Sequence, residues 1–237
     1  MKKFYNFIAK DNAVHELYVY GEIVGGSEKW TEDDVTFLDF KECIEKIPDG
    51  ATLDLYINSP GGSVFATQSI LSILDRAKAR GITINGYIDG LGASCASWLA
   101  CACDNIYIYN HSVLMLHKPM TFSFGNADNL AKEIELLNKL ENDVMIPVYL
   151  KKANTGVTED DIRNMLSKET WLTSAEIAEY FNVTLLEEER QLVACADKEI
   201  LYKYKNTPEN LLKIENINVA ENLAIKNKEI EIALALI

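Results

Sequence analysis

Residues 51–81, ATLDLYINSPGGSVFATQSILSILDRAKARG, contain a strand, a turn and a helix in succession. The segment 51–59 predicts a strand, and the Pro-Gly-Gly that follows it predicts a sharp turn. Apolar residues at helical spacing then predict a helix from Val64 to Arg80, which Gly81 ends. A strand and helix joined in this way are the building unit of a parallel sheet.

Strands and helices continue to alternate on both sides of this unit. The predicted strands cover residues 15–23, 82–88, 105–110 and 113–117. The predicted helices cover residues 31–47, capped by Thr31, and 94–103, 127–153, 158–166 and 173–181, while residues 89–92 predict a turn. Such alternation with crossover connections predicts an α/β fold with a mostly parallel sheet.

The composition favours a folded globular protein and argues against nucleic-acid-binding and membrane proteins. The 237 residues are 48% hydrophobic and 25% charged, which is typical of a folded globular chain. The net charge of −13 argues against nucleic acid or an anionic membrane as the main partner, because phosphate binding needs clustered Lys and Arg. No run approaches the roughly 18 apolar residues of a membrane helix, and residues 1–12 lack the apolar region of a signal peptide. We therefore expect an intracellular protein.

The cysteines predict packing rather than disulfides or metal binding. Five cysteines form an odd set without C-x-x-C spacing, and only three histidines accompany them. This usage is typical of reduced, buried thiols, so we expect no metal site.

Two glycine-containing turns each follow a strand and open a helix: NSPGGSV (58–64) and DGLGASCA (89–96). The start of a helix presents free backbone N–H groups and a partial positive charge, so two such turns side by side can hold a developing anion. Neither has the spacing of a P-loop or of a dinucleotide-binding fingerprint. Taken alone, each is more typical of an ordinary tight turn.

A nucleophile and a base can be chosen from the residues near these turns. Ser94 lies between small residues at a strand-to-helix turn, an arrangement that exposes a reactive serine. Cys95 is the alternative, but its side chain is expected to face the core. Among the histidines, His117 lies where a strand ends and a loop begins, whereas His15 and His111 are expected to be structural.

Four motifs in this order resemble the ClpP family of serine peptidases: INSPGGSV (57–64), GLGASCAS (90–97), VLMLHKP (113–119) and ETWLTSAEIAEY (169–180). The resemblance covers roughly residues 15–184. It implies a spiral of repeated β-β-α units, shared with the crotonase-like enzymes, and a long handle helix over 127–153. We expect a peptidase domain over residues 1–185 and a charged, mostly helical C-terminal extension over residues 186–237.

The resemblance also implies roles for individual residues. Ser94 falls on the nucleophile, His117 on the general base, and the backbone amides of Gly62 and Cys95 on the oxyanion hole. No metal or organic cofactor is implied. The family has an aspartate as the third member of its triad, whereas this chain has Glu169 in KETWLTS. A glutamate can orient an imidazole in the same way, and Asp161 is a less favoured substitute.

Within this family, three features resemble the head maturation proteases of tailed phages and prophages. They are the opening KKFYNFIAKDNAVHELYVYGEI (2–23), Glu169, and the charged extension. The resemblance implies a homo-oligomeric ring that cleaves scaffold or capsid protein without ATP, in the bacterial cytoplasm or inside a prohead there. Three alternatives stay open: a cellular Clp-type subunit working with an AAA+ unfoldase, a crotonase-like acyl-CoA enzyme, and an inactive structural ring subunit.

Overall fold

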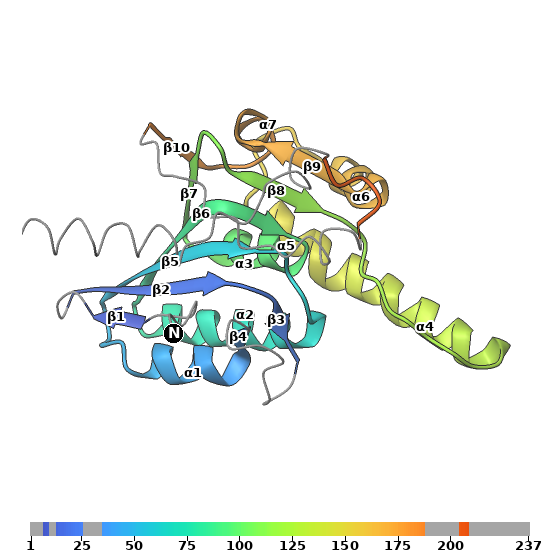
Figure 1. Ribbon diagram of the computed structural model, residues 1–237, viewed down its shortest axis with the longest axis horizontal. Helices are drawn as coiled ribbons and strands as arrows, with labels where there is room; N and C mark the ends of the chain where they lie inside the picture. The colour runs from blue at the N-terminus through green and yellow to red at the C-terminus, as the bar shows by residue number, and fades with distance from the viewer. Residues whose placement is uncertain (1–6, 10–12, 26–34, 188–203, 209–237) are drawn as a thin grey trace, which may run out of the picture.

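The computed structural model describes residues 7–9, 13–25, 35–187 and 204–208. In these ranges helices cover one face of a large twisted sheet (Figure 1). The strands are β1 (Phe7–Ala9), β2 (Val14–Tyr20), β3 (Ile23–Val24), β4 (Val35–Thr36), β5 (Thr52–Ser59), β6 (Thr83–Ala93), β7 (Asn105–Tyr109), β8 (Val113–Leu116), β9 (Thr170–Thr173) and β10 (Thr184–Leu186). The helices are α1 (Phe37–Glu45), α2 (Val64–Ala79), α3 (Cys95–Ala102), α4 (Ala127–Lys139), the π-helical η1 (Leu140–Met145), α5 (Ile146–Leu150), α6 (Glu159–Lys168) and α7 (Ser174–Tyr180).

The main sheet is dominated by parallel pairs, as the sequence predicts. Across the described part of the chain it has eight strands, in the order β1-β2-β5-β6-β7-β10, with β8 beside β6 and β9 beside β8. Only the pairs β1–β2 and β8–β9 are antiparallel in this sheet. The long strand β6 changes partner along its length, since residues 85–88 pair with β7 and residues 91–93 pair with β8. The predicted α/β fold class is therefore confirmed.

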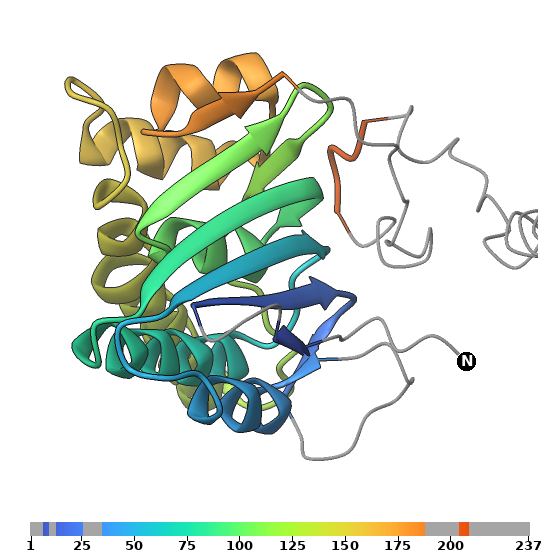
Figure 2. The ribbon, with the colours of Figure 1, turned by 90° about the vertical axis from the view of Figure 1, so that its left-hand side faces the viewer.

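The hydrophobic core lies between the sheet and the helices α1, α2 and α3 (Figure 2). Leu55 and Ile57 of β5, Ile70 and Leu74 of α2, and Leu99 of α3 have no exposed surface. Full burial of an aliphatic side chain of this size contributes about 1.5–3 kcal/mol. Rigid strands and helices thus support the turns that join them.

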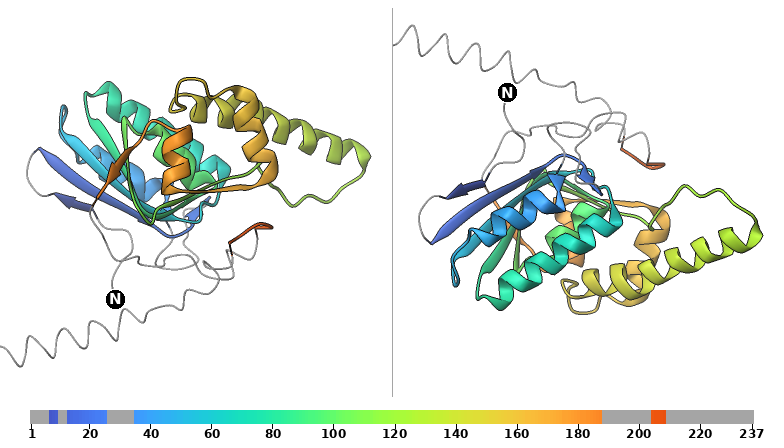
Figure 3. Two further views of the ribbon diagram at one scale, coloured as in Figure 1. Left: turned by 90° about the horizontal axis from the view of Figure 1, so that it is seen from above. Right: turned by 90° about the horizontal axis from the view of Figure 1, so that it is seen from below.

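The opposite face of the sheet carries a ladder of tyrosines. Tyr18, Tyr56, Tyr87 and Tyr107 come from the adjacent strands β2, β5, β6 and β7. Each ring stacks on the next with centroids 4.8 Å apart. The described residues 204–208 lie on this side of the sheet, away from α1 and α2 (Figure 3).

The predicted turn over residues 89–92 is wrong, because β6 continues through it to Ala93. Gly90 and Gly92 favour a turn locally, but residues 91–93 pair with β8. The amide of Leu91 also donates to Asn58 Oδ1 at 3.1 Å. Long-range pairing therefore overrides the local signal.

The predicted helix over residues 31–47 begins only at Phe37. Its cap is Thr36, which forms a capping box with Asp39, and not Thr31, which lies outside the described residues. Residues 35–36 form β4 and pair with β3. The predicted strand over residues 15–23 is likewise divided into β2 and β3 at Gly21, whose φ is 145°.

The predicted long helix over residues 127–153 is three consecutive segments: α4, η1 and α5, the last ending at Leu150. The shorter helices α6 and α7 begin after Thr158 and Thr173, each of which forms a capping box. Most of the predicted C-terminal extension, residues 186–237, lies outside the described residues; its described parts, residues 186–187 and 204–208, contain no helix, and Leu186 ends β10. None of the helices that the structure describes has the length and apolar character needed to cross a bilayer.

Candidate active site

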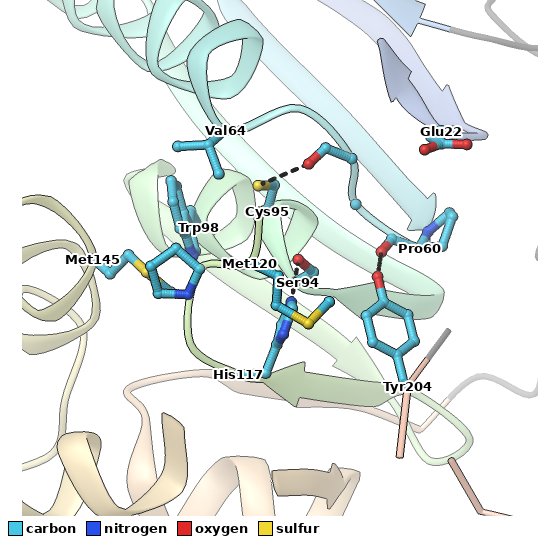
Figure 4. A pocket seen from close by; sticks show the side chains of 13 residues that line it. Glu22, Pro60, Val64, Ser94, Cys95, Trp98, His117, Met120, Met145 and Tyr204 are labelled. Carbon is cyan, nitrogen blue, oxygen red and sulfur yellow. Dashed lines mark hydrogen bonds between the residues drawn. The ribbon is translucent and has the colours of Figure 1, made fainter. Parts of the chain in front are cut away.

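Ser94 occupies the turn between β6 and α3. Its backbone has φ 53° and ψ −124°, so the chain reverses sharply and the hydroxyl faces a pocket (Figure 4). The Ser94 amide donates to the carbonyl of Met115 in β8 at 2.9 Å. The Ser94 carbonyl accepts from the Ser97 amide at 3.0 Å, which begins α3. The serine is thus fixed by a strand on one side and a helix on the other.

His117 follows β8 directly and is only 7% exposed. Because β8 runs parallel to the end of β6, the residues after both strands meet at one edge of the sheet. The His117 Nε2 atom lies 2.6 Å from Ser94 Oγ (Figure 4). Burial lowers the pKa of His117, and the Glu169 carboxylate raises it by a smaller amount. A lowered pKa keeps the imidazole neutral at neutral pH, as a proton acceptor must be.

The Pro60-Gly61-Gly62 turn lies against the turn at Ser94, where β6 ends and α3 begins. Gly61 has φ 93°, and a Cβ there would lie 2.8 Å from Ser94 Cβ and 2.9 Å from the Cys95 nitrogen. Gly62 has φ 146°, and a Cβ there would lie 2.1 Å from the carbonyl oxygen of Ile23. Both positions therefore exclude any side chain. This close approach brings the first turn, which carries the Gly62 amide, against the Ser94 and Cys95 backbone.

Cys95 is buried, and its thiol donates to the Gly62 carbonyl oxygen at 3.5 Å. Its burial raises the pKa of the thiol, as burial also raises the pKa of Cys101 and of Cys103 to about 12. These thiols stay protonated and serve as packing groups. Cys43 is buried and free as well, whereas Cys195 lies outside the described residues.

Glu169 lies between α6 and β9 with φ 51°. Its carboxylate accepts hydrogen bonds from the backbone amides of Lys205 at 3.0 Å and Asn206 at 2.7 Å. It is close enough to His117 to raise the pKa of the imidazole. However, His117 Nδ1 is buried and has no hydrogen-bond partner among the described residues. The structure thus brings Ser94 and His117 together but does not join Glu169 to His117.

The other candidate residues have different surroundings. Both hydrogen bonds of the Asp161 carboxylate go to Thr158, at 2.8 Å from its amide and 2.6 Å from its hydroxyl, and they lower the pKa of Asp161. His15 is buried in β2. His111 Nε2 lies 3.1 Å from the Asp89 carbonyl oxygen. In the described ranges, no cluster of three or more His, Cys, Asp or Glu residues could hold a metal ion.

Sequence reasoning missed several residues that line the pocket beside Ser94. They are Glu22, Val64, Trp98, Met120, Met145 and Tyr204. Trp98 and Met145 lie on core helices, where their spacing indicates only packing. Tyr204 comes from the predicted extension, and its hydroxyl donates to the Pro60 carbonyl oxygen at 2.8 Å. No local pattern in the sequence indicates that contact, because it joins two distant parts of the chain.

Comparison with known proteins points to one family. Residues 32–183 match the family described as Clp protease. An ATP-dependent Clp protease proteolytic subunit of Bacteroides fragilis is 28% identical over 139 residues, which are 58% of this chain and 64% of that protein. An ATP-dependent Clp protease proteolytic subunit 4 of Rhodococcus jostii is 32% identical over 130 residues, 54% of this chain and 64% of that protein. The chain therefore matches just under two thirds of the length of these relatives.

The matched residues span β4 to α7 and include Ser94, His117, Glu169 and both glycine-containing segments, 58–64 and 89–96. The parallel sheet and the paired turns agree with the fold that the sequence motifs led us to expect. The chain belongs to the Clp protease family.

Proposed function

We propose that this protein is a serine endopeptidase that cleaves its substrates through an acyl-enzyme. The observation that carries the proposal is the 2.6 Å contact between Ser94 Oγ and His117 Nε2, at a turn held against a second turn rich in glycine. A serine hydroxyl is a weak nucleophile until an adjacent base accepts its proton. The buried, neutral imidazole of His117 is such a base.

The reaction proceeds in two steps. His117 Nε2 accepts the Ser94 proton as Oγ attacks the peptide carbonyl, and the amides of Gly62 and Cys95 donate to the oxyanion that forms. His117 then gives its proton to the departing amine. Water, activated by the same imidazole, attacks the acyl-enzyme and releases the second product. The role of Glu169 is to accept a hydrogen bond from His117 Nδ1–H, which fixes the tautomer of the imidazole and stabilises the imidazolium that forms.

The pocket supports a preference for apolar side chains next to the cleaved bond. Val64, Trp98, Met120 and Met145 line it beside Ser94. An apolar side chain that enters removes its own surface and that of these residues from water. Methionine side chains are flexible enough to accept several apolar shapes.

Covalent labelling of Ser94 tests the proposed function. A fluorophosphonate reacts with activated serines, so mass analysis should find one phosphonyl group on the peptide that contains Ser94. The Ser94→Ala variant should not be labelled. Failure to label correctly folded wild-type protein would contradict the proposal.

We propose further that the protein works as a homo-oligomeric ring. The α4 helix extends away from the sheet and has no buried residue (Figure 1). Ile134 of α4 is 60% exposed, and Phe122 and Phe124 in the preceding segment are 98% and 96% exposed. Apolar surface gathered in this way is typical of a protein contact. A second copy of the chain is the partner that a ring requires.

Introducing a charge on this helix should break the ring. We expect Ile134→Asp to sediment as smaller species than wild type, because an unpaired carboxylate would have to be buried at the contact. Asn138→Asp adds the same charge to α4 without removing an apolar side chain and serves as the control. Sedimentation velocity measures the mass. Unchanged mass in Ile134→Asp would show that α4 does not form the contact.

The biological setting that we favour is maturation of a phage or prophage head. The features that support it are the opening segment 2–23, Glu169 in place of aspartate, and a C-terminal extension beyond the residues matched to the family. The alternative is a cellular subunit that receives its substrates from an AAA+ unfoldase. It is supported by the relatives named above, which are ATP-dependent Clp protease proteolytic subunits. The adjacent serine and histidine argue against both the crotonase-like reading and the inactive subunit.

The need for ATP distinguishes the two settings. We expect the purified protein to cleave a folded scaffold or capsid protein without ATP or an unfoldase, with Ser94→Ala as the negative control. Gel electrophoresis and mass analysis of the products measure cleavage. If folded protein is degraded only when an unfoldase and ATP are added, the cellular alternative is correct.

A further inference from the structure

One wall of the active-site pocket comes from a segment far from Ser94 in the sequence, because Tyr204 lines that pocket. We propose that residues 204–208 form a strap that borders the pocket and holds Glu169 away from His117, so that the described conformation is a latent form of the enzyme. This inference rests on the proposed peptidase function. It adds to that function a way of regulating the enzyme, because a peptidase can work without such a strap.

Tyr204 anchors the strap in the pocket. Its hydroxyl donates to the carbonyl oxygen of Pro60, in the turn that carries the Gly62 amide (Figure 4). Burial raises the pKa of Tyr204 to about 12, so the hydroxyl stays protonated and able to donate. The Tyr204 ring meets the His117 ring edge to face, with centroids 5.2 Å apart. A peptide substrate must displace this ring to reach the base.

The apolar side of Tyr204 is also packed. Its ring lies 6.1 Å from that of Trp171 in β9 and forms a small cluster with Leu91, Ala93 and Met115. These residues belong to β6 and β8, the strands that present Ser94 and His117. Packing against these two strands fixes the position of Tyr204 and therefore of the strap.

The backbone after Tyr204 binds the proposed triad carboxylate. The amides of Lys205 and Asn206 donate to the two oxygens of Glu169 at 3.0 Å and 2.7 Å. The Asn206 side chain donates to the Lys168 carbonyl oxygen at 2.8 Å. Hydrogen bonds to a charged acceptor are about twice as strong as those between neutral groups. The strap therefore competes directly for Glu169.

His117 shows the consequence of this competition. Its Nδ1 atom is buried and has no hydrogen-bond partner within the described ranges. A buried polar atom without a partner is costly, so the imidazole has a strong preference for an acceptor. Glu169 is the carboxylate whose charge reaches His117. Release of the strap would free Glu169 to accept a hydrogen bond from His117 Nδ1–H and complete the triad.

Two substitutions in the full-length protein test the strap. Lys205→Pro removes the backbone donor to Glu169, whereas Lys205→Ala keeps it and loses only an exposed side chain, which makes it the matched control. Tyr204→Phe removes the hydroxyl that donates to Pro60 and keeps the ring. The measurement is the second-order rate of Ser94 labelling by a fluorophosphonate, together with hydrolysis of an apolar fluorogenic peptide.

We expect both rates to rise about tenfold or more in Lys205→Pro, as the loss of one hydrogen bond to a charged group predicts. They should rise about fivefold in Tyr204→Phe, which loses a bond between neutral groups. Lys205→Ala should react at the wild-type rate. Equal rates in wild type, Lys205→Pro and Tyr204→Phe would overturn the strap and leave the proposed peptidase intact.

Hydrogen exchange gives a readout that does not depend on catalysis. The amides of Lys205 and Asn206 should exchange slowly in wild type, because both are bonded to Glu169, and faster in Tyr204→Phe. Exchange at the rate of a free chain in wild type would overturn the strap whatever the activity. If no variant is labelled while these amides are protected, the proposed function is overturned, and the latent state with it.

Discussion

Replacing Ser94 with alanine should lower kcat for peptide hydrolysis by about 10⁶-fold, the loss measured when the nucleophile of a serine protease is removed. The substitution deletes Ser94 Oγ, which lies 2.6 Å from His117 Nε2, so no acyl-enzyme can form. The amides of Gly62 and Cys95 are untouched and should still bind peptides. We therefore expect KM to change far less than kcat. Steady-state kinetics on a fluorogenic peptide measure both.

Ser72→Ala is the matched control, since Ser72 is exposed on α2 and its hydroxyl donates to the Gln68 carbonyl oxygen of the same helix. It should keep wild-type kinetics. Thermal unfolding should show that both variants are folded. Substantial turnover by folded Ser94→Ala would mean that another residue is the nucleophile.

Glu169→Gln should lower kcat by about 10⁴-fold, the loss seen when a triad carboxylate becomes an amide. The amide has no charge with which to stabilise the imidazolium of His117. The substitution keeps the size of the side chain, and its one amide oxygen can still accept from one of the two amides, those of Lys205 and Asn206, that bond Glu169. The loss should therefore come from the triad and not from collapse of the site.

The pH profile separates this role from a structural one. Activity is lost when His117 is protonated, so the acid limb of kcat/KM follows the pKa of His117. Burial lowers that pKa and the Glu169 charge raises it. Removing the charge should move the acid limb of Glu169→Gln to lower pH.

Glu169→Asp keeps the charge and should keep the position of the acid limb close to that of wild type. It is also the residue that the family resemblance leads us to expect at this position. Unchanged turnover and an unchanged acid limb in Glu169→Gln would place the third member of the triad elsewhere.

Local signals predict most of the fold. The Pro-Gly-Gly turn marks the end of β5 and the start of α2, and Thr158 and Thr173 mark the starts of α6 and α7. Local signals fail where a distant strand decides the conformation. Residues 89–92 are strand because β8 lies beside them, and α1 begins late because β4 pairs with β3.

In the site, too, residues with a local sequence signal can be predicted, and contacts made by a distant segment cannot. Ser94 and His117 follow from the strand-to-helix turn, the strand end and the family resemblance, because each has a local signature. Tyr204 has no such local signature, because its contacts are with Pro60 and with strands far away in the sequence. The hydrogen bonds of Glu169 depend on the same distant segment and could not be foreseen either.

Ser94 and Glu169 are, across the described residues, the two positions other than glycine with positive φ. Such a backbone costs roughly 1–3 kcal/mol per residue when a side chain is present. Glycine at either position would relieve that cost, so selection for heat resistance alone would favour removing the two side chains assigned here to the chemistry. A search for more durable variants of this protein must therefore screen for turnover as well as for melting temperature.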